Sequence, residues 1–251
     1  MKGSLPLLFL FIVTFAAGQQ SPADMFQHGN ALYQAGDYEK ALAAYRSLLA
    51  AGYVSGELYF NLGNTCYKLG HIAQAVLQYE RARRFMPNDE DLNHNLRLVN
   101  LTLADRIEPT PRLFLWDAWD SVKEAFSLNA ITWLVYLFFV LVVAAVAGMI
   151  LARTYSVRKV ALLGGTAAAL LLVASGAVFA AKLSDFNARD QGVVVANVVN
   201  IKNSPDPKSS DAFVLHTGVK IRITDRLNEW IKIRLADGKV GWMMEDDVEI
   251  I

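Results

Sequence analysis

The residue types that most often carry out chemistry are few in this sequence of 251 residues, and they form no reactive arrangement. No two of the four histidines have the spacing of metal ligands: His28, His71, His94 and His216. The sequence contains neither a glycine-rich phosphate-binding loop nor a nucleophile elbow. The formal net charge is zero, and no basic stripe with interleaved aromatics suggests nucleic-acid binding. We therefore predict a non-enzymatic protein without metal, cofactor or nucleic-acid partner.

Asparagines with binding potential recur at a fixed interval. Gly29-Asn30 and Gly63-Asn64 are 34 residues apart, and at the same interval Tyr33, Ala41 and Tyr45 coincide with Tyr67, Ala75 and Tyr79. A period of 34 is typical of the tetratricopeptide repeat (TPR), a helix–turn–helix unit. We predict an α-helical TPR domain over 19–107, with repeats at about 22–55 and 56–89. Apolar residues at helical spacing predict a capping helix over 89–107.

The repeat pattern also predicts how the helices pack. Small residues such as Gly29 and Gly63 should lie where two helices cross, with Tyr45 and Tyr79 beside them, while Gly36 and Gly70 should end helices in the left-handed conformation. The single cysteine excludes an intramolecular disulfide. Cys66 could be a nucleophile, but its place in the repeat favours a buried packing role. His28 also falls in a core position of its repeat.

The first helices of TPR units line a concave groove that receives extended peptides. By resemblance to peptide-binding TPR domains, asparagines that hold a peptide backbone would be Asn30, Asn61 and Asn64, and the same face should carry Tyr33, Phe60, Tyr67 and Lys68. Asp91 and Asn95 stand where a clamp for a terminal carboxylate would need cations, so such a ligand is not expected. Asparagine is also common in this helix for structural reasons, and both roles stay open.

The apolar residues are concentrated in segments suited to export and membrane insertion. Residues 1–18 read as a signal peptide cleaved after Gly18, or alternatively as an uncleaved anchor. Uncharged runs at 131–152 and 160–181 are each long enough to cross a bilayer. The turn between them, 153–159, carries Arg153, Arg158 and Lys159 and no acid, which predicts a cytoplasmic location. Both flanking domains should then be periplasmic, joined by a hairpin in the inner membrane.

Two features beside the spans have alternative interpretations. Residues 108–130 contain an aromatic, leucine-rich stretch with interspersed charges, which predicts an amphipathic helix at the lipid interface or, alternatively, a linker folded against the TPR cap. Small residues in both spans permit close helix approach. They predict contact within the hairpin or with the membrane helix of a partner.

From residue 188 onward, short alternating strands predict a small all-β barrel. The order Val-x-Ile-Lys-x-Ser-Pro, His-Thr-Gly and Asp-Gly-x-x-Gly-Trp resembles the bacterial SH3-like family over 188–251. That family often binds cell-wall peptides or protein segments. The resemblance implies a shallow ligand groove at Trp230 and Trp242 beside the loop 203–211, although core packing is the alternative for both indoles.

Taken in order, these parts resemble the BatE-like proteins of the Bacteroides aerotolerance (Bat) operons. The most specific stretches are 89–99, Asp-Glu-Asp-Leu-Asn-His-Asn-Leu-Arg-Leu-Val, and 104–116, Ala-Asp-Arg-Ile-Glu-Pro-Thr-Pro-Arg-Leu-Phe-Leu-Trp. The resemblance implies an adaptor in a stress-tolerance complex with von Willebrand factor A-type membrane proteins and a MoxR-type ATPase. The alternative is an envelope receptor whose SH3-like domain binds peptidoglycan or a cell-wall peptide.

Overall fold

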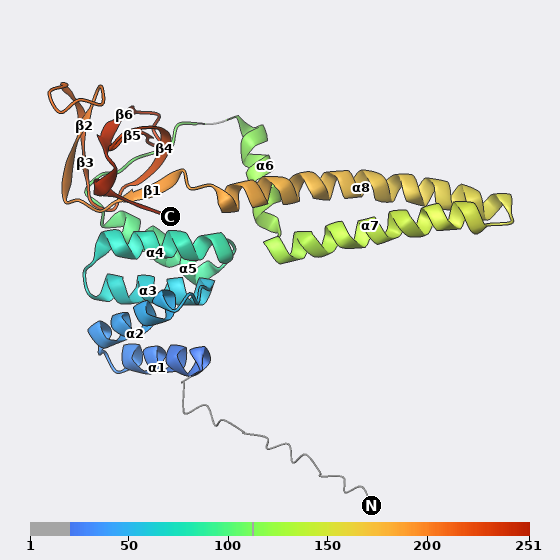
Figure 1. Ribbon diagram of the computed structural model, residues 1–251, viewed down its shortest axis with the longest axis horizontal. Coiled ribbons are helices and arrows are strands. Elements are labelled where there is room, and N and C mark those ends of the chain that lie inside the picture. The colour runs from blue at the N-terminus through green and yellow to red at the C-terminus, as the bar shows by residue number, and fades with distance from the viewer. Residues whose placement is uncertain (1–20, 112) are drawn as a thin grey trace, which may run out of the picture.

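A computed structural model describes residues 21–111 and 113–251. A stack of helices adjoins a β-domain, and a long helical hairpin projects away from both (Figure 1). The predicted signal peptide, 1–18, lies outside the described residues.

The helical stack contains two helix pairs followed by a single helix. The first pair is α1 (Pro22–Gln34) and α2 (Tyr38–Ala50), the second is α3 (Gly56–Lys68) and α4 (Ile72–Phe85), and α5 (Glu90–Leu101) follows. A Cβ atom at Gly63 would lie 2.4 Å from the ring of Tyr79, and one at Gly29 would lie 2.6 Å from that of Tyr45. These close approaches confirm the predicted helix crossings.

The helix ends and core positions of the stack follow the repeat pattern with one exception. Gly36 and Gly70 have φ angles of +81° and +76°, which confirms left-handed helix ends. Cys66 is buried in the core. The prediction for His28 was wrong, because its side chain is exposed. The helix α1 packs against α2 and α3, and His28 lies on a part of α1 that stays exposed.

The capping helix is shorter than predicted. Leu92, Leu96 and Val99 of α5 are buried as expected, but the helix ends at Leu101 rather than near residue 107. The chain then runs along the β-domain. There Ile107 packs on the β-domain core, and the main-chain N–H of Thr110 donates to the carbonyl of Ala236 at 3.1 Å.

Two long apolar helices form the hairpin, α7 (Leu128–Leu151) and α8 (Tyr155–Asn187). Both are long and apolar enough to cross a membrane by length and composition. At a rise of 1.5 Å per residue they measure about 36 and 50 Å, against the ~30 Å hydrocarbon core of a bilayer. The break between them is shorter than the predicted turn, because Arg158 and Lys159 already lie in α8. A Cβ atom at Gly165 would lie 2.8 Å from that of Ala145, so small residues make contact within the hairpin.

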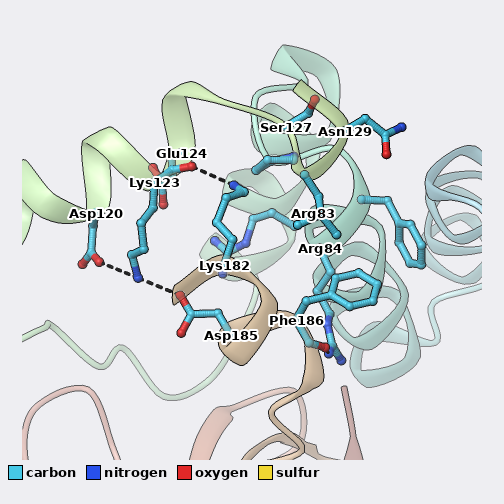
Figure 2. Close-up of a pocket in the computed structure, with 13 residues that line it drawn as sticks. Arg83, Arg84, Asp120, Lys123, Glu124, Ser127, Asn129, Lys182, Asp185 and Phe186 are labelled. Carbon is cyan, nitrogen blue, oxygen red and sulfur yellow. Dashed lines mark hydrogen bonds and ion pairs between the residues drawn. The ribbon is translucent and has the colours of Figure 1, made fainter. Parts of the chain in front are cut away.

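A short helix, α6 (Phe114–Ala125), crosses the base of the hairpin (Figure 1). It packs against α8, and its Glu124 carbonyl accepts a hydrogen bond at 2.6 Å from Asn88 in the loop before α5. Figure 2 shows Lys123 of α6 between two carboxylates, at 3.1 Å from Asp120 and 2.7 Å from Asp185 of α8. The apolar side chains of α6 and its flanks stay largely exposed: Leu113, Phe114, Leu115, Trp116, Trp119, Val122 and Phe126.

The β-domain is one antiparallel sheet of seven strands in the order β3-β2-β6-β5-β4-β1-β7. The strands are β1 (Gln191–Val194), β2 (Val198–Lys202), β3 (Asp211–His216), β4 (Lys220–Leu227), β5 (Trp230–Arg234), β6 (Val240–Met244) and β7 (Val248–Ile250). Alternate residues of β2 and β5 point into one buried cluster, as period-two patterning requires. Gly238, at φ +89°, forms the turn between β5 and β6.

The helical stack and the β-domain pack against each other through α4. Lys220 Nζ lies 2.9 Å from Glu80 Oε2, and Arg81 donates to the main-chain oxygen of Ile250 at 2.6 Å. Val193 of β1 and Ile251 belong to the same buried cluster as the TPR core. The two domains therefore share a core.

Candidate peptide-binding groove

The exposed face formed by α1, α3 and α5 contains a hollow of about 310 Å³. These helices pack side by side, as the first helices of successive repeats do. The hollow is lined by Tyr33, Asn64, Tyr67, Lys68, Tyr79, Asn95 and Leu98. Four of the seven predicted groove residues are among them.

A polar network fixes the asparagines of this face. The Tyr79 hydroxyl donates to Asn64 Oδ1 at 2.8 Å, and Asn95 Nδ2 donates to the same oxygen at 2.9 Å. One repeat earlier, Tyr45 and Asn61 make the same two bonds to Asn30 Oδ1, at 2.7 and 2.9 Å. The network thus repeats with the 34-residue period.

The network decides which polar atoms remain for a ligand. Both lone pairs of Asn64 Oδ1 accept from the protein, so this oxygen is committed to the fold. Among the described residues, neither Asn64 Nδ2 nor Asn95 Oδ1 has a hydrogen-bond partner. An amide donor and an amide acceptor therefore lie at neighbouring positions of the hollow. This pair complements the C=O and N–H groups of an extended peptide.

The hollow is neutral apart from Lys68. Burial raises the pKa of Tyr79 and, with the neighbouring Tyr38, that of Tyr33. Both hydroxyls therefore stay protonated at neutral pH and remain donors. The rings and Leu98 supply apolar contacts, and 38% of Tyr67 is exposed. This surface suits a peptide with apolar side chains, and Lys68 can contact an acidic one.

Three predicted groove residues lie elsewhere, and three lining residues, Tyr79, Asn95 and Leu98, were not predicted for the groove. Asn30 and Asn61 form the earlier copy of the network, while Phe60 packs against the Tyr79 ring at 6.1 Å between ring centroids. Tyr79 was assigned only to the helix crossing, and Asn95 was considered only as a position of the unmatched carboxylate clamp. Leu98 was missed because α5 was read as a cap. The repeat period carried the signal for Asn95, since 61 plus 34 gives 95.

Trp230 and Trp242 lie on the outward face of the β-domain rather than in its core. They alternate with the buried residues of their strands and are half-buried. Lys232 pairs with Trp242 across β5 and β6, and its Nζ lies 5.8 Å from the centre of the indole ring. Lys202 of β2 pairs with Trp242 on the other side. The face therefore combines indole and ammonium groups.

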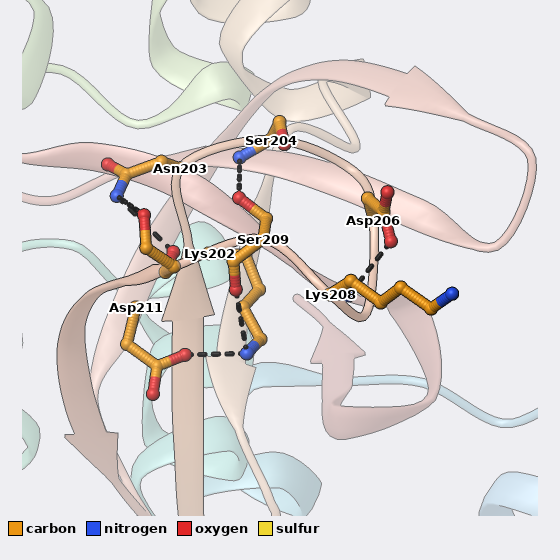
Figure 3. A network of polar contacts seen from close by, with 8 residues as sticks. Lys202, Asn203, Ser204, Asp206, Lys208, Ser209 and Asp211 are labelled. Carbon is orange, nitrogen blue, oxygen red and sulfur yellow. Dashed lines mark hydrogen bonds and ion pairs between the residues drawn. The ribbon is translucent and has the colours of Figure 1, made fainter.

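The loop beside this face is tied by its own polar contacts (Figure 3). Lys202 Nζ lies 2.6 Å from Asp211 and donates to the carbonyl of Ser209 at 3.1 Å. Asn203 Nδ2 donates to Ser210 Oγ at 3.0 Å, and the Ser204 N–H donates to Ser209 Oγ at 3.2 Å. These contacts hold the loop in one conformation beside Trp242.

The fold joins a helical-repeat groove to a small β-domain, an arrangement typical of binding modules. Comparison with known families identifies both parts. Residues 26–90 match the tetratricopeptide repeat family, and residues 197–249 match the bacterial SH3 domain family. The chain therefore contains a TPR region and a bacterial SH3 domain. No curated protein matches the sequence.

Proposed function

We propose that this protein is a non-enzymatic adaptor of the bacterial inner membrane whose TPR groove holds an extended segment of a protein partner. The observation that carries the proposal is the amide pair Asn64–Asn95. Two hydrogen bonds fix the Asn64 oxygen, while a donor and an acceptor stay open in an aromatic hollow. Domains of both matched families generally mediate protein or peptidoglycan binding.

The proposed membrane topology places both binding domains outside the cytoplasm. It is supported by the two long apolar helices and the basic residues between and just after them, Arg153, Arg158 and Lys159. The exposed apolar residues of α6 suit a helix lying in the interface. A reporter that is active only in the cytoplasm, fused at Ser156, should be active, and inactivity would reverse the orientation.

The resemblance to BatE-like proteins makes von Willebrand factor A-type membrane proteins of an aerotolerance complex the first partners to test. Tagged full-length protein would be extracted in mild detergent, and its co-purifying proteins identified and quantified. Tyr67→Ala and Asn64→Ala should reduce partner recovery about tenfold each. Arg46→Ala serves as the control, because Arg46 is exposed on α2 and does not line the groove. Equal recovery in all three variants would contradict the groove assignment.

A second candidate function is an envelope receptor whose SH3-like domain binds peptidoglycan or a cell-wall peptide. The observation that favours it is the outward face of Trp230, Trp242 and Lys232 beside a fixed loop. Indoles stack on the apolar side of amide and sugar groups, and the ammonium group pairs with peptide carboxylates. Purified cell wall should retain the full-length protein, and Trp242→Ala should release it. Retention equal to that of the Trp116→Ala control would exclude this function.

A further inference from the structure

A second hollow lies where the TPR domain, the end of α8 and the SH3-like domain meet. Its volume is about 760 Å³. Four arginines from separate parts of the chain line it: Arg81 and Arg84 of α4, Arg189 after α8, and Arg226 of β4. No Asp or Glu side chain is among its described lining residues. We call it the arginine hollow.

Only some of the N–H donors of these guanidinium groups form hydrogen bonds within the described part of the protein. Arg81 and Arg84 each donate at 2.6 Å to a main-chain oxygen, of Ile250 and Ile251, and Arg84 also donates to the carbonyl of Phe186. Each guanidinium carries five N–H donors, so further donors remain. Among the described residues, Arg226 forms an ion pair with Glu245. Arg189 has no described hydrogen bond or ion pair.

These positive charges act on one another. Burial lowers the pKa of Arg84, and the charges of Arg189 and Arg81 act in the same direction. Tyr59, which lines the hollow, and Asp190 act in the opposite direction on the pKa of Arg84, and Asp190 lies 3.6 Å from Arg222. A bound anion would relieve the repulsion. Planar guanidinium groups match phosphate and carboxylate oxygens in pairs.

The hollow adjoins the end of the helical hairpin. The Phe186 ring of α8 packs edge-on against Phe85 of α4, with ring centroids 5.6 Å apart, and Arg84 lies 5.2 Å from the centre of the Phe186 ring. These three residues also line a smaller hollow of about 270 Å³, shown in Figure 2, whose other walls come from α6 and the start of α7. The arginine hollow is thus continuous with the base of the hairpin.

We propose that the arginine hollow binds the phosphate of an anionic phospholipid headgroup. The inference rests on the proposed function, because that function puts α7 and α8 in a bilayer and their base at headgroup level. The arginines supply the phosphate contacts, and the aromatic rings of Tyr59, Phe85 and Phe186 cover the glycerol side.

The test measures lipid retention by the full-length protein. Delipidated protein in detergent is mixed with phosphatidylglycerol or phosphatidylcholine, and retained lipid is counted by native mass spectrometry. We expect the protein to retain about tenfold more phosphatidylglycerol than phosphatidylcholine, and we expect added salt to reduce this preference. Arg189→Glu should abolish the preference without unfolding the protein, since the Arg189 side chain is exposed and makes no described hydrogen bond or ion pair. Arg97→Glu, a charge reversal on the exposed face of α5, should leave it unchanged.

Two results would overturn the proposal: equal retention of both lipids, or an unchanged preference in Arg189→Glu. Competition with inorganic phosphate shows whether the bound anion is a lipid headgroup or free phosphate. Should millimolar phosphate displace the lipid and stabilise the protein as strongly, the site would belong to a soluble phosphate and the lipid assignment would be wrong. Alkaline extraction of native membranes tests separately whether the protein is inserted in the membrane, as the proposed function requires. Protein released by it is not membrane-inserted, whereas retained protein without lipid preference refutes this inference alone.

Discussion

The hydroxyl of Tyr79 donates a hydrogen bond to Asn64 Oδ1 at 2.8 Å, and this bond joins the packing of the TPR core to its exposed groove. The Tyr79 ring is buried where α3 crosses α4, while its oxygen holds the asparagine that faces the hollow. One residue therefore serves the fold and the candidate site together.

The variant Tyr79→Phe keeps the ring and removes this bond. We expect thermal unfolding to show a loss of about 1 kcal/mol, the usual net contribution of one hydrogen bond. Partner recovery should fall as well, because Asn64 loses a partner and can rotate. Tyr45→Phe removes the equivalent bond to Asn30 outside the hollow. It should cost similar stability and leave recovery intact, and equal binding losses in both variants would refute a specific role for Asn64.

The close contact at Gly63 predicts a second effect on stability. In Gly63→Ala the new methyl group would lie 2.4 Å from the Tyr79 ring, which must shift. We expect a loss of about 1–3 kcal/mol from overpacking, measured by thermal unfolding in detergent. Gly164→Ala is the matched control, because nothing lies within 4 Å of its added carbon. A Gly63→Ala protein as stable as this control would contradict the described helix crossing.

Alkaline pH should destabilise the TPR domain. Burial raises the pKa of the Cys66 thiol from 9.0 to about 11 and that of the Tyr45 hydroxyl from 10.0 to about 12. The unfolded chain therefore releases these protons at lower pH than the folded one. The stability that these two buried groups contribute is fully present below pH 9. It begins to fall above the unfolded pKa values and is lost as pH rises through the folded values of about 11 and about 12.

The contribution of Cys66 can be isolated by substitution. Cys66→Ala lacks the thiol, so its stability should stay level between pH 9 and 10, where the native protein already loses stability. Thermal unfolding at a series of pH values measures both profiles. Identical slopes for the two proteins in this interval would show that the thiol is not buried as described.

The ion pair of Glu80 and Lys220 should fix the two domains together. Glu80 is 6% exposed and also pairs with Arg83 at 2.8 Å, and burial lowers the pKa of Lys220. Glu80→Gln removes the charge that both cations contact and should cost about 1.5–3 kcal/mol. Hydrogen exchange should rise in β1 and α4, where the domains meet. Lys40→Gln, which breaks the exposed pair with Asp37, should change neither property. Unaltered exchange in Glu80→Gln would mean that the pair does not hold the domains.

The sequence predicts those parts of this structure that depend on local periodicity. The 34-residue interval places Gly63, Tyr79 and Asn64, because each repeat packs mainly on its neighbour. The uncharged runs likewise predict two long helices. In the β-domain, alternation identifies the buried residues but leaves open the role of Trp242, since an indole suits either face of a strand.

Contacts between segments far apart in the chain leave no periodic pattern in the sequence. His216 Nδ1 lies 3.0 Å from Asp105 Oδ1, and Glu80 and Lys220 are 140 residues apart, so neither pairing follows from spacing. The capping helix ends early because the segment after it packs on the β-domain instead. Helix ends at the hairpin turn were also misplaced, since Arg158 is compatible with helix and turn alike.

The central claim is that the face of α1, α3 and α5 binds a protein segment, and photo-crosslinking in native membranes tests it most directly. A photoreactive amino acid is placed either at Leu98, which lines the hollow, or at the adjacent Arg97, which does not. The account predicts that the probe at Leu98 gives discrete protein adducts that Asn64→Ala removes, while the probe at Arg97 gives none. Adducts of equal yield at both positions, or adducts from Arg97 alone, would contradict it.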